Sequence, residues 1–313
     1  MSVKVGGAGS LTEAFLYIAD AKGYFVEEGL KVEFIRFRSA SEMVAPMGTG
    51  ELDAGGGSPS PALFNAILRG IPVKIVADRT TALPGRANMA IMLRKDLVDS
   101  GKVRDFSDFR GKTIAINGTG TSTEIFLEKA LEKGGLKMTD VNVVTMGFPD
   151  TASAFAGKAI DVAVATDPSN ARSAEQGLAV RWKGEDEVNP NHEPSVLLYG
   201  PNFYQTKPEA AKRLMVAYVR GIRDYLDAFT KNKDKEQMIS ILMNTTEAKE
   251  RSLYDRMTVL GVNPDGYADP KSIAPDQDWY FSRGLMQQKV DLSKVIDNQY
   301  VEYALERLGK YQP

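Results

Sequence analysis

The sequence predicts an α/β fold in which mostly parallel sheets are covered by helices. Two observations support this: short β-rich segments alternate with segments of helical periodicity, and glycine turns separate them at the length of a βα unit. Strands joined through a helix run parallel, because the crossover returns the chain to the same edge of the sheet. The composition agrees, since 43% of the 313 residues are hydrophobic and 26% are charged, as in an ordinary globular chain.

The first third of the chain shows this alternation most clearly. Residues 31–37 alternate with a period of two, as a half-buried strand does, whereas the apolar residues of 12–22 recur at helical spacing. The same patterns predict strands at 3–6, 31–37, 52–58 and 73–77, and helices at 12–22, 39–47 and 59–69.

The middle third repeats the alternation, and the last third is mostly helical. Strands are expected at 113–116, 141–144 and 160–164, and helices at 123–132, 152–157, 209–229, 235–243, 248–260, 276–287 and 298–308. Two stretches that contain proline, 81–86 and 186–194, are expected to be breaks or loops. The single histidine, His192, lies in the second stretch and is expected on the surface.

Charge and composition exclude several classes of protein. The net charge is −2 and no block of like charges occurs, so the footprint of a nucleic-acid or anionic-membrane binder is missing. The chain has no cysteine and one histidine, which excludes disulfides, thiol nucleophiles, and thiolate or two-histidine metal sites. We therefore expect no metal, no cofactor and no nucleic-acid partner, and no pair of carboxyl groups stands out as catalytic.

The two halves of the chain echo each other. Residues 7–16 and 118–127 both read Gly-x-Gly, then hydroxyl residues, a glutamate and an apolar helix start. Further on, Asp53 matches Asp161 at nearly the same offset. Several matches in the same order, each at the same place in a βα pattern, predict a duplicated fold.

The two glycine turns are candidate ligand-binding segments. Glycine lets a ligand approach the backbone, and the first N–H groups of a helix have no partner inside it, so these turns suit an anion or a polar group. Ligands of open α/β sheets bind at the carboxyl ends of the strands, where both turns lie. The opposing interpretation is a plain N-cap at each helix, and a dinucleotide is disfavoured because threonine replaces the third glycine of that fingerprint. The candidates are Ser10, Leu11, Thr121, Ser122 and Thr123.

Five further positions are candidate ligand contacts. Gly57 and Ser58 end a run of three glycines where one would suffice for a turn, which indicates a close approach to the backbone. Asp167 holds the same place in the second half, and it either accepts a hydrogen bond from a ligand or caps its own helix. Arg79 and Arg86 flank the break at 81–86, and each could pair with a ligand anion or with a surface carboxylate, the latter being favoured.

The order of motifs resembles a known family over nearly the full length. The motifs are Glu13–Leu30, Gly50–Ala54, Gly70–Ala77, Phe106–Ala115 and Pro208–Tyr218. In this order they resemble type II solute-binding proteins of ABC importers, with the nitrate/sulfonate/taurine-binding group as the closest branch.

The resemblance implies a two-lobed type II periplasmic-binding-protein fold, with a mostly parallel sheet in each lobe and the ligand in the cleft between lobes. Lobe one would comprise 1–85 and 195–313, and lobe two 86–194, joined by hinge strands. By position, it implies ligand contacts from Ser10, Leu11, Gly57, Ser58, Thr121, Ser122, Thr123 and Asp167.

The resemblance also implies a function without catalysis. The expected role is to capture a small organic anion, a sulfonate or carboxylate that could be aromatic, and to deliver it to a membrane permease and its ATPase. A monomer in the periplasm is expected, with a signal peptide already removed from the start of this sequence. The alternative is an enzyme on the same bilobal fold, such as the small lyases of menaquinone synthesis. A relative that makes a thiamine precursor depends on a cysteine-rich motif, which this chain lacks.

Overall fold

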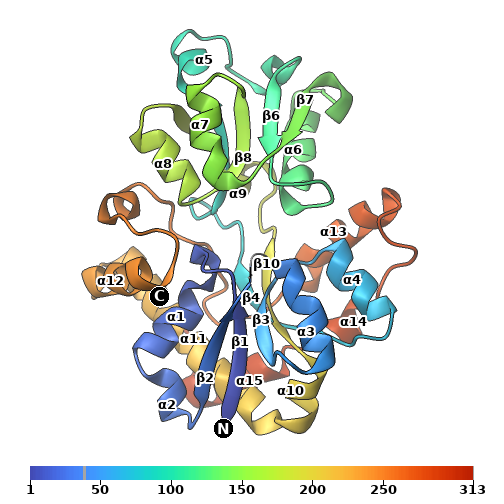
Figure 1. Cartoon of the computed structure of the whole chain (residues 1–313), viewed down its shortest axis with the longest axis vertical. Coiled ribbons are helices and arrows are strands. Elements are labelled where there is room, and N and C mark those ends of the chain that lie inside the picture. Colours follow the sequence, from blue (N-terminus) through green and yellow to red (C-terminus); the bar gives the residue numbers. More distant parts are fainter. Residues whose placement is uncertain (38–39, 313) are drawn as a thin grey trace. The chain divides into compact units, whose positions relative to one another are not determined.

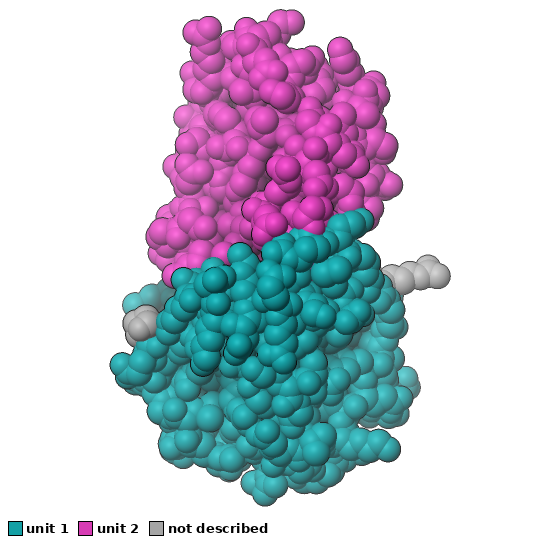
Figure 2. Space-filling view, turned by 90° about the vertical axis from the view of Figure 1, so that its left-hand side faces the viewer, with its two compact units in different colours: residues 1–81, 193–251, 262–313 teal, residues 82–192, 252–261 magenta. Residues whose placement is uncertain are grey.

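A computed structural model describes residues 1–37 and 40–312, so Ser39, the first residue of the helix expected at 39–47, lies outside the described residues. The chain divides into two compact units, drawn teal and magenta in Figure 2. Unit 1 comprises residues 1–81, 193–251 and 262–313, and unit 2 comprises 82–192 and 252–261. These boundaries differ from the expected lobes by a few residues at the crossings, and they add residues 252–261 to the second unit.

Unit 1 is built on a five-stranded sheet with helices on both sides (Figure 1). Its strand order is β2-β1-β3-β10-β4, and β10 runs antiparallel to both of its neighbours while the other four strands run the same way. The strands are β1 Ser2–Gly7, β2 Lys31–Arg36, β3 Ala54–Gly57, β4 Lys74–Thr80 and β10 Ser195–Tyr199. The parallel strands therefore end at one common edge, which we call the carboxyl edge of sheet 1.

Several helices of unit 1 (α1, α2, α10, α12 and α15) pack against the long amphipathic α11, Pro208–Lys231. The ring of Phe15 on α1 meets the ring of Tyr218 on α11 edge to face, 6.0 Å between centroids. At Gly221 an added Cβ would lie 2.1 Å from the Phe15 carbonyl oxygen, so glycine is required for this close approach of α1 to α11. The helices are α1 Ala14–Ala21, α2 Tyr24–Glu27, α3 Val44–Thr49, α4 Pro61–Leu68, α10 Pro201–Thr206, α11 Pro208–Lys231, α12 Lys235–Thr245, α13 Pro270–Ser282, α14 Leu292–Val295 and α15 Gln299–Leu308.

Unit 2 repeats the topology of unit 1. Its strand order is β7-β6-β8-β5-β9, and the fourth strand, β5, is again the antiparallel one. The elements are β5 Met89–Arg94, α5 Lys95–Asp99, β6 Thr113–Ile116, α6 Ser122–Lys133, β7 Asn142–Thr145, α7 Thr151–Ala156, β8 Val162–Thr166, α8 Ser169–Glu175, β9 Ala179–Gly184 and α9 Glu185–Val188. The predicted duplication of the fold is confirmed.

An aspartate fastens the equivalent strand of each sheet, β1 in unit 1 and β6 in unit 2, in the same way. In unit 1 the Asp53 carboxylate accepts the Lys4 N–H at 2.8 Å, and the Asp53 N–H donates to the Lys4 carbonyl at 3.0 Å. In unit 2 Asp161 makes the same two bonds with Thr113, at 2.9 and 2.8 Å. The aspartates matched in the sequence are therefore structural equivalents, and their role is to hold neighbouring strands in register.

Several sequence predictions were wrong. The helix expected at 248–260 is only the short 3₁₀ helix Arg251–Asp255, and strands β5, β9 and β10 were not predicted. Strand β5 is buried on both faces, so its sequence lacks the alternation that marks a half-buried strand. The loop expected at 186–194 begins inside helix α9, and His192 is buried rather than on the surface, with 4% of its surface exposed and its Nδ1 2.6 Å from Glu185.

Candidate ligand-binding site

The first candidate turn lies at the carboxyl edge of sheet 1. Strand β1 ends at Gly7, and the chain turns through Ala8 and Gly9 into the 3₁₀ helix Leu11–Glu13 that precedes α1. The Ser10 and Thr12 hydroxyl oxygens lie 2.8 Å apart, while Leu11 is buried. The turn therefore presents hydroxyl groups next to the strand ends, as predicted.

Two backbone donors of this turn are already engaged. Ala8 and Ser10 each donate their N–H to the carboxylate of Glu13, both at 2.9 Å. Burial raises the pKa of Tyr17, whose hydroxyl donates to the same carboxylate at 3.3 Å, and the negative charge of Glu13 raises it further. An internal carboxylate thus takes two N–H groups of the turn that the sequence predicts as a ligand-binding segment.

Arg79 lies inside unit 1 and not on the surface that the sequence analysis favoured. Only 2% of it is exposed, and its Nε donates to the Thr12 carbonyl at 3.1 Å while its Nη2 donates to the Thr12 hydroxyl at 2.7 Å. The same Nη2 lies 3.4 Å from Glu13 Oε1. The guanidinium therefore orients the turn, because its bonds run to residues of the turn itself.

The three consecutive glycines make room for side chains of the same unit. A Cβ at Gly56 would lie 1.7 Å from Arg79 Nη1, and a Cβ at Gly57 would lie 2.3 Å from Leu198 Cδ1. The close approach inferred from the sequence thus exists, and Arg79 and Leu198 make it. Ser58 follows β3 and is half-buried.

The second turn repeats the first at the carboxyl edge of sheet 2. The Thr121 and Thr123 hydroxyl oxygens lie 2.8 Å apart, as Ser10 and Thr12 do, and Gly120 donates its N–H to Glu124 at 2.6 Å. The Thr121 hydroxyl also donates to the Gly118 carbonyl at 2.8 Å. Thr123 is buried and donates to Asn117 Oδ1 at 2.7 Å, and Ser122 is half-buried at the start of α6. The internal echo is therefore an echo of hydrogen-bond pattern as well as of sequence.

Asp167 is buried at the end of β8 with protein donors on both oxygens. Its Oδ1 accepts the Ala171 N–H of α8 at 3.1 Å, and its Oδ2 accepts the Thr258 N–H at 2.9 Å. Burial raises the pKa of this carboxyl to about 6, although these bonds and the charge of Arg181 lower it. Asp167 therefore caps its helix and fastens residues 252–261 to unit 2. The other candidate of this unit, Arg86, is half-buried in the turn before β5.

Asp78 lies buried near the end of β4. Its Oδ2 accepts the Thr81 hydroxyl at 2.7 Å and the Asn263 N–H at 2.6 Å. Burial raises the pKa of this carboxyl from 3.8 to about 7, against the lowering effect of its hydrogen bonds. Thr81 is the last residue before the chain enters unit 2, and Asn263 follows its final return to unit 1. The Asp78 carboxyl is thus hydrogen-bonded to residues at two of the points where the chain passes between the units.

Arg36, the last residue of β2, was not among the site residues predicted from the sequence. It pairs in register with Gly7, so it reaches the carboxyl edge of sheet 1 beside the turn. Its side chain is exposed, and within residues 1–37 and 40–312 it makes no hydrogen bond or ion pair. The strand-end rule applied to the strand predicted at 31–37 would have identified it.

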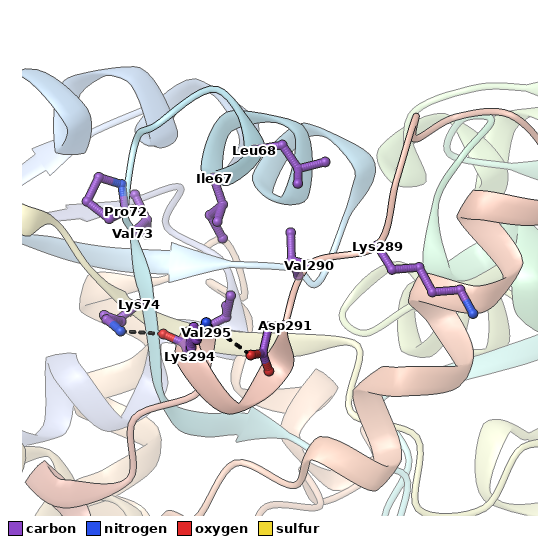
Figure 3. Close-up of a pocket in the computed structure, with 10 residues that line it drawn as sticks. All are labelled: Ile67, Leu68, Pro72, Val73, Lys74, Lys289, Val290, Asp291, Lys294 and Val295. Carbon is purple, nitrogen blue, oxygen red and sulfur yellow. Dashed lines mark hydrogen bonds and ion pairs between the residues drawn. The ribbon is translucent and has the colours of Figure 1, made fainter.

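A cavity of about 330 Å³ lies elsewhere on unit 1 (Figure 3). Its apolar lining is formed by Ile67, Leu68, Pro72, Val73, Val290 and Val295. Lys74 begins β4, whereas Arg79 lies near its end. The Lys74 Nζ donates to the Lys294 carbonyl, and the Lys294 Nζ lies 3.5 Å from Asp291 Oδ2. None of the predicted ligand-contact residues lines this cavity.

Residues 1–37 and 40–312 hold neither a cluster of metal ligands nor a membrane-spanning helix. In that part of the chain, no three His, Cys, Asp or Glu side chains come together as metal ligands would. None of its helices combines the length and the apolar character needed to cross a membrane.

Comparison with known proteins identifies the family. The model described as NMT1/THI5 like matches residues 12–228, and the chain belongs to this family. A Brucella abortus protein that is named as a binding protein is 30% identical to this chain over 217 residues. The match covers 67% of this chain and 62% of the relative, which is less than two thirds of the relative's length. A Bacillus subtilis protein assigned to the binding of aliphatic sulfonates is 25% identical over 97% of this chain and 88% of its own.

One relative is an enzyme, and the fold is shared with a solved binding protein. The 4-amino-5-hydroxymethyl-2-methylpyrimidine phosphate synthase of Aspergillus parasiticus is 26% identical over 55% of this chain and 47% of its own. The periplasmic aliphatic sulphonate binding protein SsuA from Escherichia coli superposes with a TM-score of 0.74 at 19% identity, covering 95% of this chain and 92% of that one. The chain thus has the type II periplasmic-binding-protein fold, as its sequence predicts.

Proposed function

We propose that this protein is the solute-binding component of an ABC-type importer and that it captures a small organic anion, a sulfonate or a carboxylate. The observation that carries the proposal is the pair of matching turns. At the carboxyl edge of each sheet, two hydroxyl oxygens lie 2.8 Å apart beside the strand ends. Hydroxyl groups hold a ligand by hydrogen bonds without a chemical step, and of these two turns the one in unit 1 has a hydroxyl hydrogen left to donate, whereas both hydroxyls of the unit 2 turn donate to protein oxygens.

The relatives support the same proposal. Two of them are assigned as binding proteins, one of them for aliphatic sulfonates, and the solved SsuA structure is a periplasmic sulphonate-binding protein. We extend the proposal to a periplasmic location, to a monomer, and to partnership with a membrane permease and its ATPase. Of the ligand contacts predicted from the sequence, we propose Ser10, which lies at the turn of unit 1. Arg79, Thr123 and Asp167 form hydrogen bonds within the protein instead.

An enzymatic role receives less support from the residues. The chain has no cysteine, on which the resemblance makes the thiamine-precursor activity depend. Its one histidine, His192, is buried against Glu185 inside unit 2. We therefore propose capture rather than conversion of the ligand.

The test is a thermal-shift panel combined with mass spectrometry of the ligand that co-purifies. The panel contains ethanesulfonate, octanesulfonate, benzoate, nitrate, neutral pyrimidines and nucleotides. A ligand at a hundred times its dissociation constant stabilises the folded state by about 2.7 kcal/mol, which raises Tm by about 4 °C for a chain of 313 residues. A response to neutral compounds or nucleotides alone refutes the anion assignment, and conversion of a panel compound to product refutes the binding role.

A further inference from the structure

We infer that Arg36 supplies the positive charge that selects an anionic ligand, in place of the Arg79 or Arg86 suggested by the sequence; this inference rests on the proposed function. Arg36 ends β2 and pairs with Gly7, the last residue of β1. The Phe37 N–H then donates to the Gly7 carbonyl at 2.9 Å, so the pairing holds to the end of the strand. The side chain of Arg36 therefore starts beside the turn that carries Ser10.

The guanidinium of Arg36 lies against the backbone of that turn. A Cβ added at Gly9 would fall 2.7 Å from Arg36 Nη1 and 2.9 Å from its Cζ. Gly9 also has a φ of +77°, a conformation that other residues adopt at a cost. Both constraints keep a side chain out of the space that the guanidinium uses.

Arg36 brings to this edge a positive charge that no described side chain pairs with. Glu13 and Arg79 form an ion pair with 3% of each side chain exposed, so together they contribute no net charge. Arg36 is exposed, and no partner for its side chain exists among the residues that the structure describes. A guanidinium with free N–H groups pairs well with the two or three oxygens of a carboxylate or sulfonate.

The hydroxyl groups of this turn have one donor to spare. Thr12 Oγ1 accepts from Arg79 Nη2, and only one of the Ser10 and Thr12 hydrogens is needed for the bond between the two hydroxyls. The second hydrogen can therefore go to a ligand. In unit 2 the corresponding Thr121 and Thr123 hydroxyls both donate to protein oxygens.

The two units differ at the position of Arg36. Thr145 ends β7 and pairs with Ile116 as Arg36 pairs with Gly7, and the following N–H donates to the Ile116 carbonyl at 3.0 Å. Because threonine carries no charge, the duplicated architecture bears a cation at this position in unit 1 alone. The geometry therefore assigns recognition of the ligand's oxyanion to Arg36 and the Ser10 turn.

The test compares charged ligands with neutral counterparts of nearly the same shape. Binding of ethanesulfonate and ethanesulfonamide, and of benzoate and benzamide, is measured by calorimetry for the wild type, Arg36→Gln, Arg36→Lys and Arg86→Gln. Arg69→Gln is the matched control, since Arg69 is also an exposed arginine of unit 1 and lies outside the turn. Melting temperatures confirm that every variant is folded.

Arg36→Gln is expected to weaken binding of the anion by about ten- to a hundredfold, the effect of losing a hydrogen bond to a charged group. The amide counterpart should change by less than twofold, Arg36→Lys should recover part of the loss, and Arg69→Gln should match the wild type. If the wild type binds an anion and Arg36→Gln binds it equally well, this inference fails and the proposed function stands. Loss in Arg86→Gln without loss in Arg36→Gln also overturns the inference. If the wild type binds no anion, the proposed function itself fails.

Discussion

Replacing Arg79 by methionine should destabilise unit 1 strongly, although the substitution conserves most of the side-chain volume. The change removes two hydrogen bonds to Thr12, at 3.1 and 2.7 Å, and the ion pair with Glu13 at 3.4 Å. Glu13 is 3% exposed, so its carboxylate would remain buried without a cation. Removing one partner of a buried pair costs about 3–5 kcal/mol, which corresponds to a fall in Tm of roughly 6–20 °C.

The two tryptophans make the assay specific to one unit. Trp279 lies in unit 1 and Trp182 in unit 2, so in a Trp182→Phe background the fluorescence reports unfolding of unit 1. Urea unfolding is measured in that background for Arg79→Met, Glu13→Gln and the double variant. Because Glu13→Gln removes the stranded charge, the double variant should lose less stability than the two single losses added together. A loss below about 1 kcal/mol for Arg79→Met, or strict additivity, would refute the buried-pair account.

Three further predictions follow from the same structure. Gly56→Ala should destabilise unit 1 in urea unfolding, because the added Cβ would lie 1.7 Å from Arg79 Nη1. In an Arg79→Met background most of this loss of stability should disappear. The control is Gly157→Ala, which lies at a helix end with room for a methyl group and should leave the stability nearly unchanged. The pKa of Asp78 is about 7 in the folded state and 3.8 in the unfolded chain, so between these values the native protein keeps a proton that the unfolded chain loses. The free energy of unfolding of the wild type, measured relative to Asp78→Asn, should therefore fall from about pH 4 to pH 7 and then level off. Parallel pH profiles of the two proteins would contradict this. Asp167→Ala should free the Thr258 N–H and speed its hydrogen exchange by about ten- to a hundredfold, with unchanged exchange at Thr258 as the contrary result.

The local architecture and its duplication could be predicted from the sequence. Period-two and helical patterns located most strands and helices of both units, and the repeated Gly-x-Gly turns located two equivalent positions at the strand ends. These features are readable because each depends on residues a few positions apart. Where a segment is buried on both faces, as in β5, the pattern disappears and the strand was missed.

The polar partner of each candidate residue could not be predicted, because it depends on the folded arrangement of distant segments. Arg79 bonds to Thr12 and Glu13, and Asp167 accepts a hydrogen bond from Thr258, because folding brings together residues that are 66 to 91 positions apart. Once buried, a polar group forms hydrogen bonds with the polar groups beside it. The exposed Arg36 was left over by the same process, since β2 ends where the turn of β1 begins and no carboxylate of the described chain reaches it. The residue types of a ligand site are thus written locally, but which of them stays free for a ligand is settled by long-range pairing that no local pattern records.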